Sequence, residues 1–310
     1  IEAASLVTSE LDALAYTKPT DKERETKIKK FCEKFVERAL RQPLNKDLKK
    51  YYIDDIFQKV KDVNLATKRI VLLTLCSAEF LYPVAGIEKP NLSNIASRLS
   101  LALWDSLPDE KLLKDVQYGK LNKTEIIRRH ASRMIQDRRT RTKLAGFFHH
   151  WLELDRAKKV TKDEAIFPEF SRQLLSDLRV SLDLFLEHVV WSEKSDYREL
   201  LTADYLYLND RLKKLYFGED KSKVAKDDSF KAVKVGNKRS GVITHPYLLT
   251  SFAYHNSTSP IHRGVFLTRN IVGRQLKPPP KAISFTNIKF EPNLTMREKV
   301  THFTKDNSCM

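Results

Sequence analysis

The chain has 310 residues, 41% hydrophobic and 31% charged, a balance that excludes an intrinsically disordered protein and leaves room for one large or several small domains. Only 8 glycines are present, which argues against Gly-rich loops, collagen-like repeats and many tight hairpins, and favours helices. The net charge of +16 would attract acidic partners such as nucleic acid, anionic polysaccharide, membrane headgroups or an acidic redox protein, although solvated lysine-rich helix faces explain it equally well.

Helical periodicity dominates the first two thirds of the chain. Asn45 precedes an amphipathic stretch and is expected to cap a helix. The run from Ile70 to Tyr82 contains Glu79 and is shorter than the roughly 20 residues of a transmembrane helix, so it predicts a buried helix. Cys32 and Cys76 both lie in apolar helical stretches, and we expect both to be buried and structural.

The central part predicts a further series of helices. The first begins at Asn91. A second begins around Leu107-Pro108, with the proline near its first helical position, and a capping box at Asn122–Glu125 predicts the start of a third. The longest helix follows Pro168. Asp177 lies off its apolar stripe, which is formed by Leu174, Leu178, Leu182, Phe185 and Val189.

The residue pattern of the C-terminal third differs from that of the rest of the chain. Residues 219–240 are polar and lysine-rich, and beyond them short apolar runs alternate with Ser, Thr, Asn and Pro. Pro278–Pro280 cannot be helical, whereas Thr295–Glu298 predicts a capping box for a last helix running towards His302. The expected fold is mainly α, a multi-helix body with a loop-rich, partly irregular C-terminal region. The predicted parts are an N-terminal helical domain (1–90), a central helical domain (91–218), a linker or long loop (219–240) and a C-terminal domain (241–310).

Local motifs do not predict an active site. The glycines at 236 and 241 have the spacing of a phosphate-binding loop, but Val242 follows where the lysine is required. His149 and His150 point about 100° apart on a helix and cannot face one metal ion. Two loop sets remain open. His245, His255 and His262 would hold a metal only if the fold gathers them. Asp204, Asn209 and Asp210 form either a cation or acid/base site or ordinary Asx caps and turns.

The densest positive charge lies in one arginine cluster, formed by Arg128, Arg129, Arg133, Arg138, Arg139 and Arg141. No aromatic residue interleaves with it in the sequence, so it lacks the stacking platforms of a single-strand nucleic-acid binder. A non-enzymatic basic scaffold that docks an acidic partner is therefore favoured over nucleic-acid binding.

Four sets of segments carry a resemblance to a known family. They are FVERALRQPL with LCSAEFLY; IASRLSLALWDSLPDEKLL; RMIQDRRTRTKLAGFFHHWLELD with FPEFSRQLLSDLR and ADYLYLNDRLKKLYFG; and SGVITHPYLLTSFAYHNSTSPIHRGVFLTRNIVGRQLKPPP. Together they resemble the consecutive domains of unknown function in large planctomycete and verrucomicrobial c-type-cytochrome-linked proteins.

That resemblance implies haem c in the intact protein. In the family the last domain continues past a histidine into Cys-x-x-Cys-His, the attachment motif for haem c, and His302 and Cys309 stand at the positions of that histidine and the first cysteine. The chain ends at Met310, before a second cysteine, so we expect either a fragment or the end of the ordered part. A free thiol in a frayed tail is the alternative for Cys309.

The resemblance further implies a periplasmic or otherwise extracytoplasmic location. It also implies an electron-transfer or oxidoreductase role, with a redox partner or other domains of a larger assembly. Arg263 and Gly264 occupy recognisable family positions, although Ser259-Pro260 also predicts a helix start that Arg263 would pin by ion pairing. Substrate, reaction and catalytic residues do not follow from the resemblance.

Overall fold

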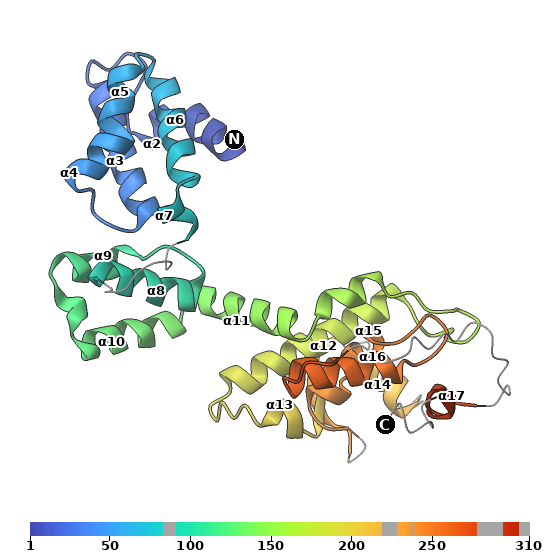
Figure 1. Ribbon diagram of the computed structural model, residues 1–310. Coiled ribbons are helices and arrows are strands. Elements are labelled where there is room, and N and C mark those ends of the chain that lie inside the picture. Colours follow the sequence, from blue (N-terminus) through green and yellow to red (C-terminus); the bar gives the residue numbers. More distant parts are fainter. Residues whose placement is uncertain (83–90, 219–227, 237–238, 278–293, 304–310) are drawn as a thin grey trace. The chain divides into compact units, whose positions relative to one another are not determined.

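A computed structural model describes residues 1–82, 91–218, 228–236, 239–277 and 294–303 (Figure 1). These residues are mainly helical, which confirms the expected α fold with a loop-rich, partly irregular C-terminal region. They form two compact units, Ile1–Lys143 and Leu144–Met310, and helix α11 (Arg138–Trp151) runs through the boundary. Among the described residues, no helix combines the length and the apolar content needed to cross a bilayer.

The first unit begins with seven helices around one apolar core. They are α1 (Glu2–Ser9), α2 (Leu11–Leu14), α3 (Arg24–Leu40), α4 (Lys46–Lys49), α5 (Asp55–Lys59), α6 (Val63–Leu75) and α7 (Ala78–Leu81), with a π-helical turn at Lys50–Asp54. Ile28, Val36 and Ile70 are fully buried between α3 and α6. The predicted cap is confirmed, because the side chain of Asn45 accepts a hydrogen bond from the Leu48 N–H at 2.8 Å.

The two cysteines of this region differ in exposure. Cys32 is buried, with its Sγ 3.7 Å from Thr67 Oγ1, and burial raises the pKa of its thiol to about 11. The prediction that Cys76 is buried was wrong. The apolar run breaks where α6 ends at Leu75 and Ser77 caps α7, so Cys76 lies exposed at the junction.

The same unit continues with α8 (Leu92–Trp104), α9 (Glu110–Gln117), a 3-10 turn at Lys120–Asn122 and α10 (Thr124–Ile135). The buried residues of α8 are mostly small (Ser93, Ala96, Ser97 and Ser100), with Trp104 at its end, while Leu92 and Leu99 are partly buried against the same core. Its serines can be buried because their hydroxyls bond within the helix, as when Ser97 donates to the Ser93 carbonyl oxygen at 2.8 Å.

Two of the predicted helix starts in this region differ from the structure. Asp109 caps α9 by accepting from the Leu112 N–H at 3.0 Å, so Pro108 lies before the cap rather than at the first helical position. The capping box at Asn122–Glu125 was wrong, because Asn122 belongs to the 3-10 turn and α10 begins without a side-chain cap.

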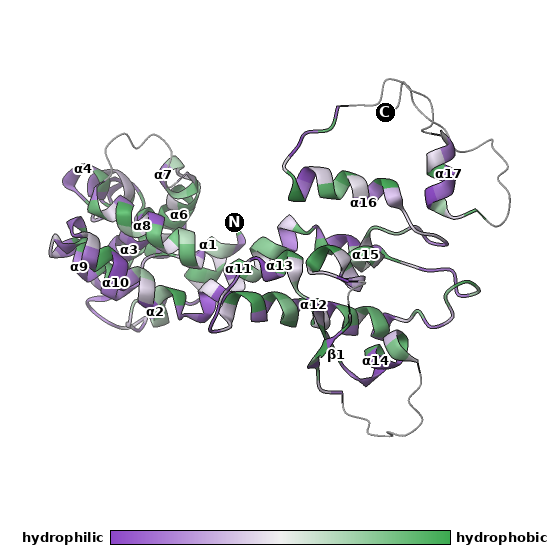
Figure 2. Ribbon diagram, turned by 90° about the horizontal axis from the view of Figure 1, so that it is seen from below, coloured by the Kyte–Doolittle hydropathy of each residue, from purple (hydrophilic) through white to green (hydrophobic). Residues whose placement is uncertain are grey.

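The second unit packs around α12 (Arg172–Trp191), and Figure 2 shows hydrophobic and hydrophilic residues alternating along this helix. Its predicted stripe is confirmed, with Leu178, Leu182, Phe185 and Val189 all buried. The other elements are a 3-10 segment (Leu154–Lys159), α13 (Glu199–Thr202), β1 (Tyr205–Leu208), α14 (Asp210–Phe217), β2 (Lys231–Lys234), a 3-10 turn (Val242–Thr244), α15 (Pro246–Ser251), α16 (Pro260–Phe266), a π-helical turn (Leu267–Ile271) and α17 (Met296–Phe303).

Strands β1 and β2 form a two-stranded antiparallel sheet, in which Tyr205 lies opposite Lys234 and Leu208 opposite Lys231. Strand β2 falls inside residues 219–240, the segment predicted as a linker or long loop. The last helix starts as predicted, because Thr295 N–H donates to Glu298 Oε2 at 2.7 Å while Glu298 N–H donates to Thr295 Oγ1 at 3.3 Å. Pro278–Pro280 and Cys309 lie outside the described residues.

One polar residue of α12 departs from expectation. Asp177 was predicted off the buried stripe, but only 6% of its side chain is exposed. It accepts a hydrogen bond from Arg211 Nε of α14 at 2.6 Å, and this ion pair connects the two helices.

Candidate functional site

The arginine cluster gathers around a tryptophan that the sequence places far from it. Trp104, the last residue of α8, is 4% exposed, and its indole N–H donates to the Met134 carbonyl oxygen at 3.0 Å. The Arg139 guanidinium lies 3.4 Å from the centre of the indole ring, and that of Arg133 lies 5.6 Å from it. Because Arg139 covers this ring, the tryptophan serves as a packing surface for cations rather than as an exposed platform for bases.

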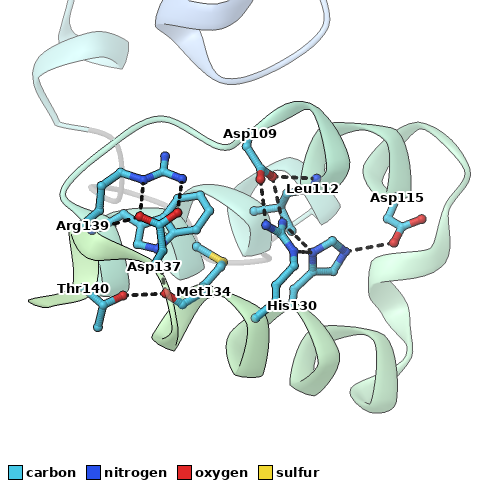
Figure 3. Close-up of polar contacts among 10 residues, drawn as sticks. Asp109, Leu112, Asp115, His130, Met134, Asp137, Arg139 and Thr140 are labelled. Carbon is cyan, nitrogen blue, oxygen red and sulfur yellow. Dashed lines mark hydrogen bonds and ion pairs between the residues drawn. The ribbon is translucent and has the colours of Figure 1, made fainter. Parts of the chain in front are cut away.

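Arg133 also begins a chain of polar contacts that runs through His130 to Asp115. Figure 3 labels Asp109, His130 and Asp115 in this chain. Its two terminal nitrogens donate to the carboxylate of Asp109 at 2.7 and 2.8 Å, and its Nε donates to His130 Nδ1 at 3.0 Å. Because Nδ1 accepts, the imidazole proton lies on Nε2, which donates to Asp115 Oδ2 at 2.9 Å. At the other end of the cluster, Asp137 pairs with Arg139 at 2.8 Å.

The carboxylates of this network are held in their charged form. Burial by itself would raise the pKa of Asp109, but hydrogen bonds from Arg133 and from the Leu112 N–H outweigh it, and the net pKa is lowered. The hydrogen bond from Arg139 lowers the pKa of Asp137 to about 2, and the bond from His130 lowers that of Asp115. Such carboxylates are poor general bases near neutral pH.

The network therefore braces α8, α9 and α10 rather than forming a catalytic centre. Its aspartates, His130 and two arginines all have partners within it. The remaining arginines of the cluster are exposed: Arg128, Arg129, Arg138 and Arg141. The chemistry that this region offers to a partner is thus a positively charged surface on α10 and α11.

The histidines considered as metal ligands have separate roles. His245 is buried, caps α15 by accepting from the Tyr247 N–H at 3.3 Å, and lies 3.3 Å from Ser181 Oγ. Burial lowers the pKa of this imidazole to about 3, so it is neutral. His255 lies 3.2 Å from Thr161 Oγ1, whereas His262 packs against Tyr254. Within the described ranges, no group of three His, Cys, Asp or Glu side chains is placed to hold a metal ion.

Asp204, Asn209 and Asp210 flank β1 and make separate structural contacts, and of these three residues Asn209 is the one that caps a helix. Asn209 is fully buried and caps α14 by accepting from the Leu212 N–H at 3.0 Å, while Asp210 pairs with Lys213 at 3.1 Å. Asp204 accepts from the Val235 N–H through its backbone oxygen at 2.9 Å. Of the adjacent histidines on α11, His149 contacts Asp183 at 2.9 Å and His150 is exposed.

Of the C-terminal residues that carry the family resemblance, the structure describes those in α16 and α17 but not Cys309. Ser259 caps α16, as predicted, by accepting from the His262 N–H at 3.3 Å. Arg263 donates to the Leu249 carbonyl oxygen at 3.3 Å, and the ion pair predicted for it is not found among the described residues. His302 is exposed in the last turn of α17, and Cys309 lies outside the described residues.

Comparison with known families gives two matches. Residues 91–217 match the family model PSD4, a protein of unknown function (DUF1592), and residues 239–310 match PSCyt3, a protein of unknown function (DUF1588). No curated protein and no solved structure matches the chain.

The matched segments do not coincide with the compact units. The boundary after Lys143 divides the first match, so that its earlier part belongs to the first unit. Its later part shares one core with the second match, in which Leu182 and Leu212 join Val242 and Phe266. The two matched segments are therefore structurally continuous within the second unit.

Proposed function

Because the chain carries consecutive DUF1592 and DUF1588 domains, the pair typical of planctomycete cytochrome-linked proteins, we propose that it is an extracytoplasmic electron-transfer or oxidoreductase module of a multidomain c-type-cytochrome-linked protein. The order of the two domains, with Cys309 at the end of the second, carries the proposal. In a Cys-x-x-Cys-His motif two thiols attach the haem covalently and the histidine ligates its iron. Cys309 would be the first of these thiols.

The described residues next to this tail are compatible with such a role. Helix α17 has a reciprocal capping box, and hydrogen bonds from Thr295 lower the pKa of Glu298, so the cap is charged at neutral pH. The helix therefore has a defined start and carries the exposed His302 on its last turn. In this proposal α17 is the helix that precedes the haem-binding segment in the chain.

The proposal predicts covalent haem on the full-length protein. Produced as the full product of its gene in a host that attaches haem c, the protein should show a Soret band and retain haem on a denaturing gel. Cys309→Ser should abolish normal two-thiol attachment, whereas Cys76→Ser, which changes an exposed thiol elsewhere, should leave it intact. Absence of both the Soret band and the haem stain from the wild type would refute the proposal.

A second function, docking of an acidic partner, is favoured by the exposed arginines of α10 and α11. The internal network engages Arg133 and Arg139, while Arg128, Arg129, Arg138 and Arg141 remain at the surface. Exposed ion pairs contribute about 0.2–1 kcal/mol each, so several acting together give a measurable, salt-sensitive affinity. This function needs no haem and is separable from the first.

Docking predicts a loss of binding to a sulfated polysaccharide when these four arginines become glutamine. Affinity for heparin should fall roughly tenfold, from the summed ion-pair contributions. Replacing Lys18, Lys22, Lys46 and Lys61 by glutamine removes the same charge from exposed positions of the first unit and should have a smaller effect. Equal losses in the two variants would argue for net charge alone, and tighter binding to duplex DNA than to heparin would favour the nucleic-acid alternative.

A further inference from the structure

The second unit contains a cavity that none of the predicted sites includes. Its volume is about 470 Å³, within the roughly 300–1,000 Å³ of small-molecule sites. Three cationic side chains line it: Lys162, Arg239 and Arg263. They come from three separate segments, namely the loop after the 3-10 segment Leu154–Lys159, the approach to the turn at Val242, and helix α16.

Among the residues that the structure describes, no carboxylate forms an ion pair with any of these three cations. Each donates to a backbone carbonyl oxygen: Lys162 to Tyr254 at 2.5 Å, Arg239 to Thr244 at 3.0 Å, and Arg263 to Leu249 at 3.3 Å. A carbonyl oxygen accepts a hydrogen bond from a cationic side chain but does not neutralise its positive charge. The one acidic side chain among the lining residues, Glu169, is exposed to solvent.

Arg263 retains an unused donor. Its Nε is buried and has no hydrogen-bond partner among the described residues. Burial lowers the pKa of Arg263, and the pKa of Lys162 is lowered by burial and by the nearby charge of Arg263. A buried donor beside two mutually repelling cations is a site that an anion would stabilise, because it supplies both an acceptor and the opposite charge.

The other walls restrict the kind of anion. Aromatic and aliphatic side chains line much of the cavity, among them Phe167, Phe170, Leu174 and Leu249. The hydroxyl residues Thr250, Ser257 and Thr258 also line it and are potential donors. A bare inorganic ion would leave the apolar walls uncovered, and a neutral apolar molecule would leave the cations without a partner.

From this arrangement we propose that the cavity between the loop at Lys162 and helix α16 binds a small organic anion, a carboxylate carried on an apolar or aromatic body. The carboxylate lies near Lys162 and Arg263, and the body contacts the phenylalanines. This site is independent of the proposed haem, so failure of either proposal leaves the other standing.

Calorimetric titration of the whole chain with 2-naphthoate tests the proposal, with 2-naphthamide as its neutral analogue and sulfate as the anion without a body. Naphthoate should bind at one saturable site at least about tenfold more tightly than either comparison ligand, since charge-assisted hydrogen bonds and the apolar body both contribute. Naphthamide binding as tightly as naphthoate would overturn the role of the cations. Sulfate binding as tightly would overturn the role of the apolar walls.

Variants assign the binding to this cavity. Lys162→Gln and Arg263→Gln should each weaken naphthoate binding about tenfold or more. Arg269→Gln removes the same charge from an exposed residue of the neighbouring π-helical turn and should leave the affinity unchanged. Because Arg263 also contacts the backbone, circular dichroism of its variant is compared with wild type, and Lys162→Gln provides the readout if that variant unfolds. Unchanged affinity in folded Lys162→Gln would overturn the assignment.

Discussion

Replacing Arg211 by methionine will destabilise the second unit by about 2 kcal/mol near neutral pH, since it leaves the buried carboxylate of Asp177 without its ion-pair partner. Only 6% of the Asp177 side chain is exposed, against 43% for Arg211. The arginine donates to both carboxylate oxygens, at 2.6 and 3.1 Å. Gln173 remains as a donor at 3.2 Å and moderates the loss.

The same substitution should change how stability depends on pH. Burial by itself would raise the pKa of Asp177, but hydrogen bonds from Arg211 and Gln173 outweigh it, and the net pKa is lowered. The ion pair therefore stabilises the wild type fully above the unfolded-state pKa of about 3.9, and this contribution is lost as the pH falls through the lower folded-state value. The difference in unfolding free energy between wild type and Arg211→Met should accordingly shrink in acid.

Urea denaturation at neutral pH and at successively lower pH values measures both effects. Lys213→Met is the control, because the pair of Lys213 with Asp210 has both side chains 38% exposed and should contribute less than about 0.5 kcal/mol. A loss as large in the control as in Arg211→Met, or a difference that stays constant with pH, would contradict this account of Asp177.

Local sequence patterns predicted those parts of the fold that depend on local interactions. The caps at Asn45, Ser259 and Thr295 were predicted because a cap is made by residues three positions apart. The stripe of α12 was predicted because helical periodicity determines which residues share a face. At Asn122 the prediction was wrong, because this residue belongs to a 3-10 turn, in which the Lys123 N–H donates to the Lys120 carbonyl oxygen.

Contacts between distant residues account for what the sequence did not predict. Asp177 is buried because Arg211 of another helix compensates its charge, and neither residue signals this locally. Trp104 enters the arginine cluster only once α8 packs beside α10. The cationic cavity likewise depends on the fold, because Lys162, Arg239 and Arg263 are far apart along the chain. Sequence composition predicted a positive surface. In the structure the positive charge lies in three places: the ion-pair network between α8, α9 and α10, the exposed surface of α10 and α11, and the cationic cavity.

Gly241→Ala should destabilise the second unit by about 3 kcal/mol or more, because the backbone at this position admits no side chain. Gly241 has a φ of +54°, and its N–H donates to the Ala203 carbonyl oxygen at 2.8 Å. An added Cβ would overlap the Leu200 carbonyl oxygen and lie 2.6 Å from Leu201 Cα. Since these atoms belong to the backbone, no change of rotamer relieves the clash.

Gly264→Ala is the matched control for this substitution. Gly264 lies in α16 with nothing within 4 Å of an added Cβ, so alanine there should be neutral or stabilise by up to about 1 kcal/mol. Thermal or urea unfolding compares the two variants, and similar stabilities would contradict the close approach at Gly241.

The contact of Gly241 with the backbone of Leu200 and Leu201 joins the DUF1588 segment to the end of the DUF1592 segment. It lies two residues from Arg239 of the cavity. Loss of naphthoate binding in Gly241→Ala under conditions where the protein stays folded would therefore indicate that the junction between the two domains positions the anion site.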